Sequence, residues 1–354
     1  MTELNLEWEN FMKNSPDPNN INTASKKKTI FLPKCLPLYI STQTKIGFLN
    51  KTIPLEEIFW NLPTIEYYTP REGIIKKIIK INSNTQEEVD ILEEKIKNTN
   101  NIQVDIISKI DNVTGAVKRF KDIRKIIVGI SKKDLINFRK KKKSAFYNCF
   151  AVIVRIFHKG VFKEINVKLF NTGKLEIPGI KDIETLFIAV NILTNFINSI
   201  SNLNVKHIES KLSTVLINSN FSCNYYINRD ILYNILKFEY GIHSLFDSCS
   251  YPGIQCKYFY NINNKHTGVC NCKNKCDLNK KNPNNLCRVI SFMIFRTGSV
   301  LVVGNCDEDT LNTVYGFIVK LLTKECERIR ANDKEVFRKK KEKKYRKRIV
   351  SFIE

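Results

Sequence analysis

The chain has 354 residues, of which 43% are hydrophobic, so it can bury a sizeable core as one large or two modest domains. Its formal net charge of +23 favours a polyanionic partner, most often nucleic acid, with an anionic membrane surface as the alternative. No apolar run approaches the roughly 18 residues that a membrane span needs. The polar, acidic N-terminus does not resemble a secretory signal, so eleven cysteines indicate a reducing, intracellular compartment.

The first elements are predicted from turn residues and alternation. Residues 1–36 read as a disordered arm, since they combine prolines, asparagines and a lysine run. Leu38 to Phe48 alternates as a strand, and a helix is expected to begin at Pro54. Its apolar side would consist of Leu55, Ile58 and Phe59. Gly73 to Ile81 is strand-like, although a short helix remains an alternative.

An insertion is predicted at about 84–148, between strands of the first half. It opens with an acidic helical pattern up to about residue 113 and then becomes strongly basic, ending in the run Arg139 to Lys143. The β-branched segment Phe150 to Phe157 follows as a strand, and Lys159-Gly160 is the expected turn after it.

One structural unit occurs twice. The segment Ile165 to Ile197 recurs as Ile290 to Leu322 at a constant offset of 125 residues, which indicates a duplication. Each copy predicts strand, Thr-Gly turn, strand and long helix, with an aspartate as the N-cap. The matched pairs are Phe170/Phe295, Thr172/Thr297, Gly173/Gly298, Gly179/Gly304, Asp182/Asp307, Thr185/Thr310 and Leu186/Leu311. The expected inward faces of the helices are Leu186, Val190, Leu193 and Ile197 in one copy and Leu311, Tyr315, Ile318 and Leu322 in the other.

The second half repeats the order of the first. After a segment from Val205 to Asn220, a helix is predicted to begin at Asn228 or Arg229, followed by a strand in Tyr251 to Ile262. That helix would turn Ile231, Leu232 and Ile235 inward. Each half therefore has a strand, a short helix, a strand, a hairpin and a long helix, which predicts an α+β fold with both halves in one sheet. The expected domains are an arm (1–36), a first repeat (37–200), a second repeat (201–328) with a cysteine-rich loop at 263–287, and a basic tail (329–354).

Alternation in the second copy separates two faces of the sheet. Phe292, Ile294, Val300 and Val302 are expected to meet the helices, whereas Met293, Phe295, Leu301 and Val303 lie on the other face. Both sets are apolar, although the uncovered side of an antiparallel sheet is normally polar. Either another layer, such as the insertion, covers this second face, or the face binds a partner.

These residues resemble the TATA-box-binding protein family. The resemblance lies in Phe170-x-Thr-Gly with Gly179 and in Phe295-x-Thr-Gly with Gly304, each followed by a helix. Further support comes from Ile40 to Gly47, Tyr68-Thr69-Pro70, Asn218, Ser222-Cys223 and Tyr251-Pro252-Gly253. It covers roughly 38–81 and 150–325, and the insertions are similar to those of relatives in large DNA viruses.

The resemblance implies two repeats that form one saddle-shaped antiparallel sheet with helices on the convex face. It implies binding of A·T-rich DNA in the minor groove, where aromatic wedges pry base steps apart, and recruitment of RNA polymerase with a transcription factor IIB-like factor. A monomer, a nuclear or viral-factory location and no membrane or enzymatic role are expected. The implied DNA-binding residues are Phe170, Asn218, Tyr251, Lys257, Met293, Phe295, Leu301 and Val303.

The first repeat departs from the family pattern. Gly73 falls where the second wedge is expected, and the partner of Asn218 aligns near Leu38, which has no amide. Lys168, Glu176 and Pro178 replace apolar residues on the outer face, and a carboxylate facing phosphates is unfavourable unless neutralised. We therefore expect the second repeat to be the stronger DNA reader.

Four cysteines of the polar loop have the spacing of a metal site. Cys270, Cys272, Cys276 and Cys287 could hold a structural Zn²⁺, with His266 as a substitute ligand and free thiols as the alternative reading. The run Arg139 to Lys143 and the tail Arg338 to Arg348 would contact phosphate or serve as solvated charge or a nuclear-targeting signal.

Two other functional classes, an enzyme and a protein-binding scaffold, are alternatives to a DNA-bending initiation factor. A DNA repair enzyme such as a glycosylase would need a catalytic Asp or Lys in a helix–hairpin–helix context, which the sequence does not contain. Nucleotide-binding loops, zinc-protease motifs and nucleophile elbows are also missing from the sequence, which argues against a metabolic enzyme. A protein-binding scaffold that kept the fold and lost its DNA contacts is the remaining alternative.

Overall fold

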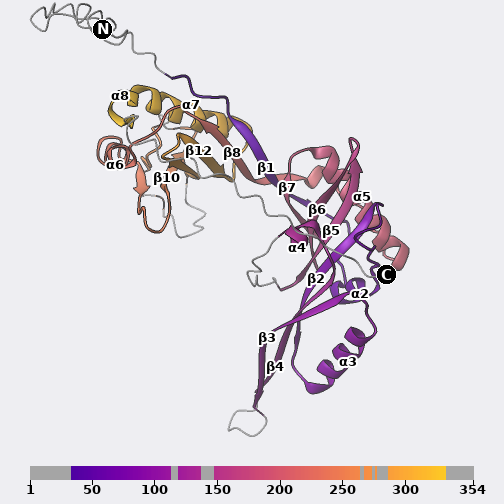
Figure 1. The fold of residues 1–354 in the computed structure, drawn as a ribbon. Helices are drawn as coiled ribbons and strands as arrows, with labels where there is room; N and C mark the ends of the chain where they lie inside the picture. Colours follow the sequence, from indigo (N-terminus) through magenta and orange to yellow (C-terminus); the bar gives the residue numbers. More distant parts are fainter. Residues whose placement is uncertain are drawn as a thin grey trace, which may run out of the picture. The chain divides into compact units, whose positions relative to one another are not determined.

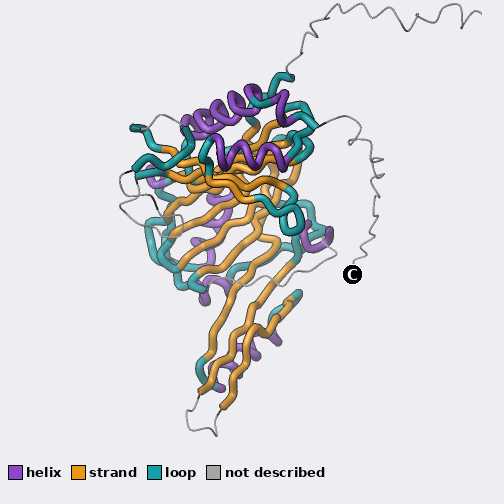
Figure 2. Tube along the Cα trace, turned by 90° about the vertical axis from the view of Figure 1, so that its left-hand side faces the viewer, coloured by secondary structure: helices purple, strands orange, loops and turns teal. Residues whose placement is uncertain are grey.

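The computed structural model describes residues 33–112, 119–136, 147–263, 267–272, 276 and 286–331, with a compact unit that begins at Lys34. Predictions for residues 1–32, for Arg139 to Lys143, for His266 and for the tail Arg338 to Arg348 lie outside these residues. The compact unit is built on a single antiparallel sheet, with the strands side by side in one continuous layer (Figure 2).

Ten strands of this sheet come from two equivalent halves. In the first, the spatial order is β2 (Gly73–Ser83), β5 (Cys149–His158), β6 (Val161–Phe170), β7 (Lys174–Ile180) and β1 (Tyr39–Phe48). In the second, the order read inward from the other edge is β9 (His243–Leu245), β10 (Gly253–Tyr260), β11 (Arg288–Phe295), β12 (Ser299–Gly304) and β8 (Ser213–Ser222). The halves meet where β1 pairs with β8, so the predicted duplication in one antiparallel sheet is confirmed.

The main helices cover one face of the sheet (Figure 1). They are α2 (Leu55–Asn61) and α5 (Ile183–Ile200) in the first half, with α6 (Arg229–Asn234), the π-helical turn η2 (Ile235–Glu239), α7 (Glu308–Lys324) and α8 (Cys326–Ile329) in the second. A 3₁₀ turn, η1 (Glu209–Lys211), precedes β8. Two apolar clusters form the core, one beneath α5 and α2 and the other beneath α7 and α6.

Turn and cap residues act as predicted from the sequence. Gly173 and Gly298 have φ of 79° and 77°, a conformation that glycine adopts without strain. Each donates its backbone N–H to the carbonyl of the phenylalanine three residues earlier, Phe170 or Phe295. The Asp182 and Asp307 carboxylates accept backbone hydrogen bonds at the starts of α5 and α7, and Asn228 does so for α6.

The segment between β2 and β5 adds two strands to the sheet. It contains α3 (Gln86–Lys97), β3 (Ile102–Asn112), β4 (Arg119–Gly129) and α4 (Lys132–Ile136), and β4 pairs with β2 while β3 forms the edge. The expectation of helix up to about residue 113 is wrong beyond Lys97, because Ile102, Val104 and Ile106 alternate with polar residues in a strand pattern. Gly73 to Ile81 is a strand, not a helix.

Three details of the helices differ from expectation. Ile231 is exposed, whereas Leu232 and Ile235 are buried as predicted. In α7, Val314 points into the core. Tyr315, which was expected there, is half-buried, and its hydroxyl donates a hydrogen bond to the Leu36 carbonyl. By length and composition α5 could cross a membrane, contrary to the expectation that no run is long enough. It packs its fully buried Leu186, Val190, Leu193 and Ile197 on the sheet, as a core helix does.

Candidate nucleic-acid interface

The two faces of the second half differ in exposure as the alternation predicts. Phe292, Ile294, Val300 and Val302 are at most 1% exposed beneath the helices. Met293, Phe295, Leu301 and Val303 are half-buried on the opposite face, which we call the outer face. The predicted assignment of these eight residues to two faces is therefore confirmed, while their contact with DNA stays a prediction.

Two aromatic rings lie together at one end of this outer face. The centroids of Tyr251 and Phe295 are 5.9 Å apart with an angle of 57° between the rings. Gly253 pairs with Phe295 across β10 and β11, and a Cβ at Gly253 would come within 3.0 Å of the Phe295 ring and 3.1 Å of the Tyr251 ring. A glycine at this position therefore gives both rings the space to lie over the strand.

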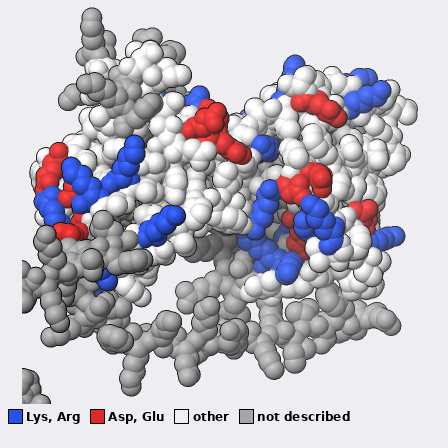
Figure 3. Space-filling model, turned by 90° about the horizontal axis from the view of Figure 1, so that it is seen from above, with Lys and Arg blue, Asp and Glu red and all other residues white. Residues whose placement is uncertain are grey.

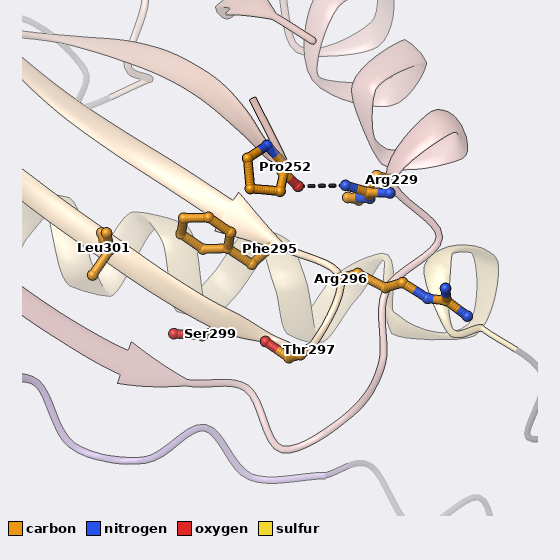
Figure 4. A pocket seen from close by; sticks show the side chains of 7 residues that line it. All are labelled: Arg229, Pro252, Phe295, Arg296, Thr297, Ser299 and Leu301. Atoms are coloured by element: carbon orange, nitrogen blue, oxygen red, sulfur yellow. Dashed lines mark hydrogen bonds between the residues drawn. The ribbon is translucent and has the colours of Figure 1, made fainter. Parts of the chain in front are cut away.

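Basic groups adjoin this aromatic pair. Arg229, Pro252, Phe295, Arg296, Thr297, Ser299 and Leu301 line an open hollow of about 530 Å³ (Figure 4). The Arg229 guanidinium donates a hydrogen bond to the Pro252 carbonyl, which fixes it beside the strand that carries the aromatic rings. Sequence reasoning missed Arg229 as a site residue, since it lies on α6 and reaches the hollow only through the fold.

Strand register joins the other predicted residues into rows. One row across five strands consists of Lys257, Ser291, Val303, Asn218 and Thr42. The Lys257 ammonium donates to the Ser291 hydroxyl at 2.8 Å, and the Asn218 amide donates to the Thr42 hydroxyl at 3.2 Å. The next row consists of Gln255, Met293, Leu301 and Asn220. The second-half residues predicted from the sequence thus lie on one continuous surface.

The partner position of Asn218 in the first half is not near Leu38. Thr42 pairs with Asn218 and Thr44 pairs with Leu216, so the junction between the halves makes Thr44 the equivalent of Asn218. Leu38 precedes β1. Thr44 has a hydroxyl where the second half has an amide, and it can still donate and accept hydrogen bonds.

The first half carries Phe170 at the place of Phe295, but its neighbours are charged. Lys174 holds its ammonium 5.4 Å from the Phe170 centroid. Lys168 and Glu176 lie opposite each other and form an ion pair with an N–O distance of 2.6 Å. The Glu176 carboxylate is thus neutralised on the outer face, where it would otherwise repel phosphate.

The expectation that Gly73 stands at the second wedge position of the first half is wrong. β5 pairs with β6 as β10 pairs with β11, and Cys149 lies opposite Phe170 as Gly253 lies opposite Phe295. Tyr147 precedes Cys149 by two residues, as Tyr251 precedes Gly253. Gly73 belongs to β2, which matches β9 in the other half. Because the insertion separates β2 from β5, the strand equivalent to β10 lies much later in the chain than Gly73.

Part of the insertion covers one end of the first half's outer face. The ammonium of Lys76, on the outer side of β2, binds the Asp134 carboxylate of α4 at 2.6 Å. The backbone N–H of Lys132, at the start of α4, donates to both oxygens of Glu164 on the outer side of β6 at 3.1 Å. Covering by the insertion, one of the two explanations for the apolar outer face, thus applies to this end of the first half.

Charges of both signs share the face seen in Figure 3, where Lys and Arg side chains adjoin Asp and Glu side chains. Among the described residues, Arg288–Asp307 at 2.9 Å and Arg328–Glu239 at 2.5 Å are examples of ion pairs between exposed side chains. The described residues of this face therefore carry no extended patch of a single sign.

The four predicted cysteine ligands come together. The Sγ atoms of Cys270, Cys272, Cys276 and Cys287 all lie within 4.8 Å of one another. Cys272 is 3.5 Å from Cys287 and 3.8 Å from Cys276, and Cys287 is 3.9 Å from Cys270. Tetrahedral Zn²⁺ with Zn–S bonds of about 2.3 Å sets its sulfur ligands about 3.8 Å apart, so the donor set fits zinc. Burial raises the pKa of the Cys270 thiol, but hydrogen bonds from the Cys276 and Cys272 backbone outweigh this effect and lower it to about 7.

A second cluster of potential ligands has a structural explanation. His158 Nε2 lies 3.0 Å from the Asp182 carboxylate and 3.6 Å from that of Glu184, at the start of α5. Lys159 approaches the same two carboxylates at 3.3 and 3.6 Å. Its ammonium supplies the positive charge that a cation would bring.

Comparison with known proteins supports the resemblance seen in the duplicated motif. No protein-family model matches the chain. A segment of 208 residues is 27% identical to the "TATA-box-binding protein-like" protein of Acanthamoeba polyphaga mimivirus, covering 54% of this chain and 52% of that protein. The chain thus spans about half the length of this curated relative. The solved structure "Methanococcus jannaschii TBP" aligns with 82% of this chain and 99% of its own, at 12% identity and a TM-score of 0.38. The viral relative confirms the resemblance.

Proposed function

Because this chain is a divergent relative of a viral TATA-box-binding-protein-like protein, we propose that it is a non-enzymatic transcription initiation factor. It binds A·T-rich duplex DNA in the minor groove through the outer face, bends the duplex and recruits RNA polymerase with a transcription factor IIB-like factor. It acts as a monomer inside the cell, in the nucleus or a viral factory. The helix-covered face is the side left free for protein partners.

One observation carries this proposal: the Tyr251 and Phe295 rings lie together over Gly253 at the end of an apolar outer face. Apolar side chains that enter a minor groove can wedge between base steps, and the unstacking is repaid by the contacts that a bent duplex permits. Met293, Leu301 and Val303 continue the apolar surface, and Asn218 offers hydrogen bonds to base edges at its centre.

The test measures affinity of the full chain for A·T-rich and G·C-rich duplexes over a range of salt concentrations. Phe295→Ala and Tyr251→Ala should each lower affinity for the A·T-rich duplex about tenfold or more, and reduce bending in an end-labelled duplex. Phe238→Ala is the matched control, because Phe238 is 72% exposed on η2. The same substitution at Phe170 or Tyr147 should cost less, since charged residues surround them. Wild-type affinity in both second-half variants would contradict the proposal.

A protein-interaction scaffold is the second candidate function. It is favoured by the Lys168–Glu176 ion pair and by α4 on the outer face, which both reduce the surface that the first half offers to DNA. Equal affinity for both duplexes, with a steep salt dependence and no effect of the aromatic substitutions, would support it.

We also propose that the four-cysteine cluster binds a structural Zn²⁺. Zinc would hold together the loop between β10 and β11, while the ligands leave no open position for catalysis. Protein purified without chelator should contain one zinc per chain. Cys270→Ser with Cys276→Ser should abolish it and lower the unfolding temperature, whereas Cys249→Ser, at an exposed cysteine outside the cluster, should not. Zinc-free wild-type protein would refute the site.

A further inference from the structure

Two lysines face each other on the outer side of the sheet, where the insertion joins the first half. Lys80 of β2 pairs directly with Lys125 of β4, and both side chains are half-buried. Their face follows from register, because Lys80 lies two residues beyond Ile78, which pairs with the outer-face residue Ala151. Like charges directly opposite each other destabilise a sheet. Each lysine has a partner of its own, since the Tyr147 ring lies beside Lys80 and the Asp105 carboxylate beside Lys125.

The lysine pair is continuous with the aromatic end of the first half. The Lys80 ammonium lies 3.6 Å from the ring centroid of Tyr147, a cation–π distance. Tyr147 in turn lies two residues before Cys149, which pairs with Phe170. A single band of the outer face therefore leads from Phe170 past Tyr147 to Lys80 and Lys125.

The outer side of β2, β4 and β3 carries more basic than acidic residues. Lys76, Lys80, Lys121 and Lys125 lie on it beside the isoleucines Ile78, Ile123 and Ile127, and the Asp105 carboxylate is 3.5 Å from the Lys125 ammonium. Lys76 is paired with Asp134 and Lys125 with Asp105, so Lys80 and the exposed Lys121 supply the positive charge that these two ion pairs do not balance. The acidic helix α3 packs on the opposite side, where Val89 and Leu92 are buried. The surface thus complements a polyanion.

We propose that β2 and the added strand β4 extend the DNA interface, with Lys80 and Lys125 binding backbone phosphates of the duplex just outside the segment that the first half contacts. This rests on the proposed function. Neighbouring strands are about 4.8 Å apart, so β4 lies about 14 Å from β6, which carries Phe170. That distance is about four steps of a duplex strand at 3.4 Å each. The added strands therefore reach DNA that flanks this segment. Because they would contact phosphates, their binding does not depend on the flanking sequence.

The test compares two duplexes, one with the A·T-rich core alone and one with the same core extended by mixed-sequence flanks. The full chain should bind the flanked duplex more tightly. Lys80→Gln with Lys125→Gln should lower the affinity for the flanked duplex about tenfold or more. It should reduce the slope of log affinity against log salt concentration by about two and leave the affinity for the core duplex nearly unchanged. The matched control is Lys97→Gln with Lys320→Gln, two exposed lysines on the helix-covered side. Circular dichroism checks that both double variants are folded.

The outcomes separate this inference from the proposed function. Core binding that depends on Phe295, combined with an unchanged gain from flanks in the Lys80/Lys125 variant, overturns the inference alone. Equal losses in the two lysine double variants overturn it as well, because the effect would then be one of net charge. Absence of duplex binding by the wild-type chain overturns both proposals.

Discussion

At the scale of single residues, one lysine is buried for a structural reason. Lys77 is 4% exposed on the helix-covered side of β2. Its ammonium donates to the carbonyls of Phe59 at 2.5 Å and Leu62 at 2.6 Å, at the end of α2. The last carbonyls of a helix lack partners within the helix, and α2 has no basic residue in its last turn. Lys77 thus caps α2 from a neighbouring strand.

This position predicts a pH dependence of stability. Burial lowers the pKa of Lys77 to about 8, whereas a lysine in the unfolded chain has a pKa of about 10.4. Between these values the unfolded state binds the proton and the native state does not, so this group makes the free energy of unfolding rise with pH. Below pH 8 both states are protonated and the contribution is constant.

Urea unfolding between pH 7.5 and 10.5 checks this expectation. The difference in stability between wild type and Lys77→Met should grow in favour of the wild type as pH rises through this window. Lys97→Met, at an exposed lysine, should give a constant difference. Parallel curves for wild type and Lys77→Met would mean that the pKa of Lys77 is not lowered.

Aromatic positions show where residue-level prediction fails. Phe170 and Phe295 share a local motif, so the sequence alone places them at equivalent turns. Tyr147 has no such motif, and only the pairing of Cys149 with Phe170 reveals its position. Thr44 became the counterpart of Asn218 in the same way, through the pairing of β1 with β8.

At the scale of elements, a glycine determines each hairpin turn, but the atoms packed around the turn decide how much stability a substitution of that glycine would lose. Gly160 and Gly298 both have φ of 77°. A Cβ at Gly160 would meet nothing within 4 Å, whereas a Cβ at Gly298 would lie 2.2 Å from the Tyr225 carbonyl oxygen. Substituting Gly160 would therefore add backbone strain alone, whereas substituting Gly298 would add both backbone strain and a steric clash.

Alanine substitution measures the two contributions. Gly160→Ala should lower the free energy of unfolding by about 1 kcal/mol, the cost of a left-handed conformation in a residue with a Cβ. Gly298→Ala should cost at least about 2 kcal/mol more, because the backbone around Tyr225 has to move. Urea unfolding of both variants gives the comparison, and equal losses would mean that the turn relaxes freely.

The insertion illustrates what element prediction misses. The acidic, amphipathic pattern predicts α3, but the helix ends at Lys97 and not at about residue 113. β4 was missed because lysines on its outer face, such as Lys121 and Lys125, interrupt its apolar pattern. Alternating isoleucines in β3 carried the signal, but they follow the helix after only a few residues.

At the scale of the whole molecule, the two repeats have the same strand order and different outer faces. The second half presents apolar residues in register across its strands, and the first presents an ion pair and a helix from the insertion. This difference is why the aromatic substitutions in the second half are expected to cost more DNA affinity. The band from Phe170 to Lys125 would let the first half contribute through phosphates instead.

Five features could be predicted from the residues alone: the duplication, the turns, the helix caps, the two faces of the second repeat's strands and the clustering of the four cysteines. All of these depend on spacing within one short segment, where periodicity and turn chemistry act directly. The places of Tyr147, Thr44, Lys80 and Arg229 on the outer face emerge only from the folded chain. Each place depends on which strands or helices become neighbours across long stretches of chain, and the insertion between β2 and β5 changes that distance without leaving a local signal.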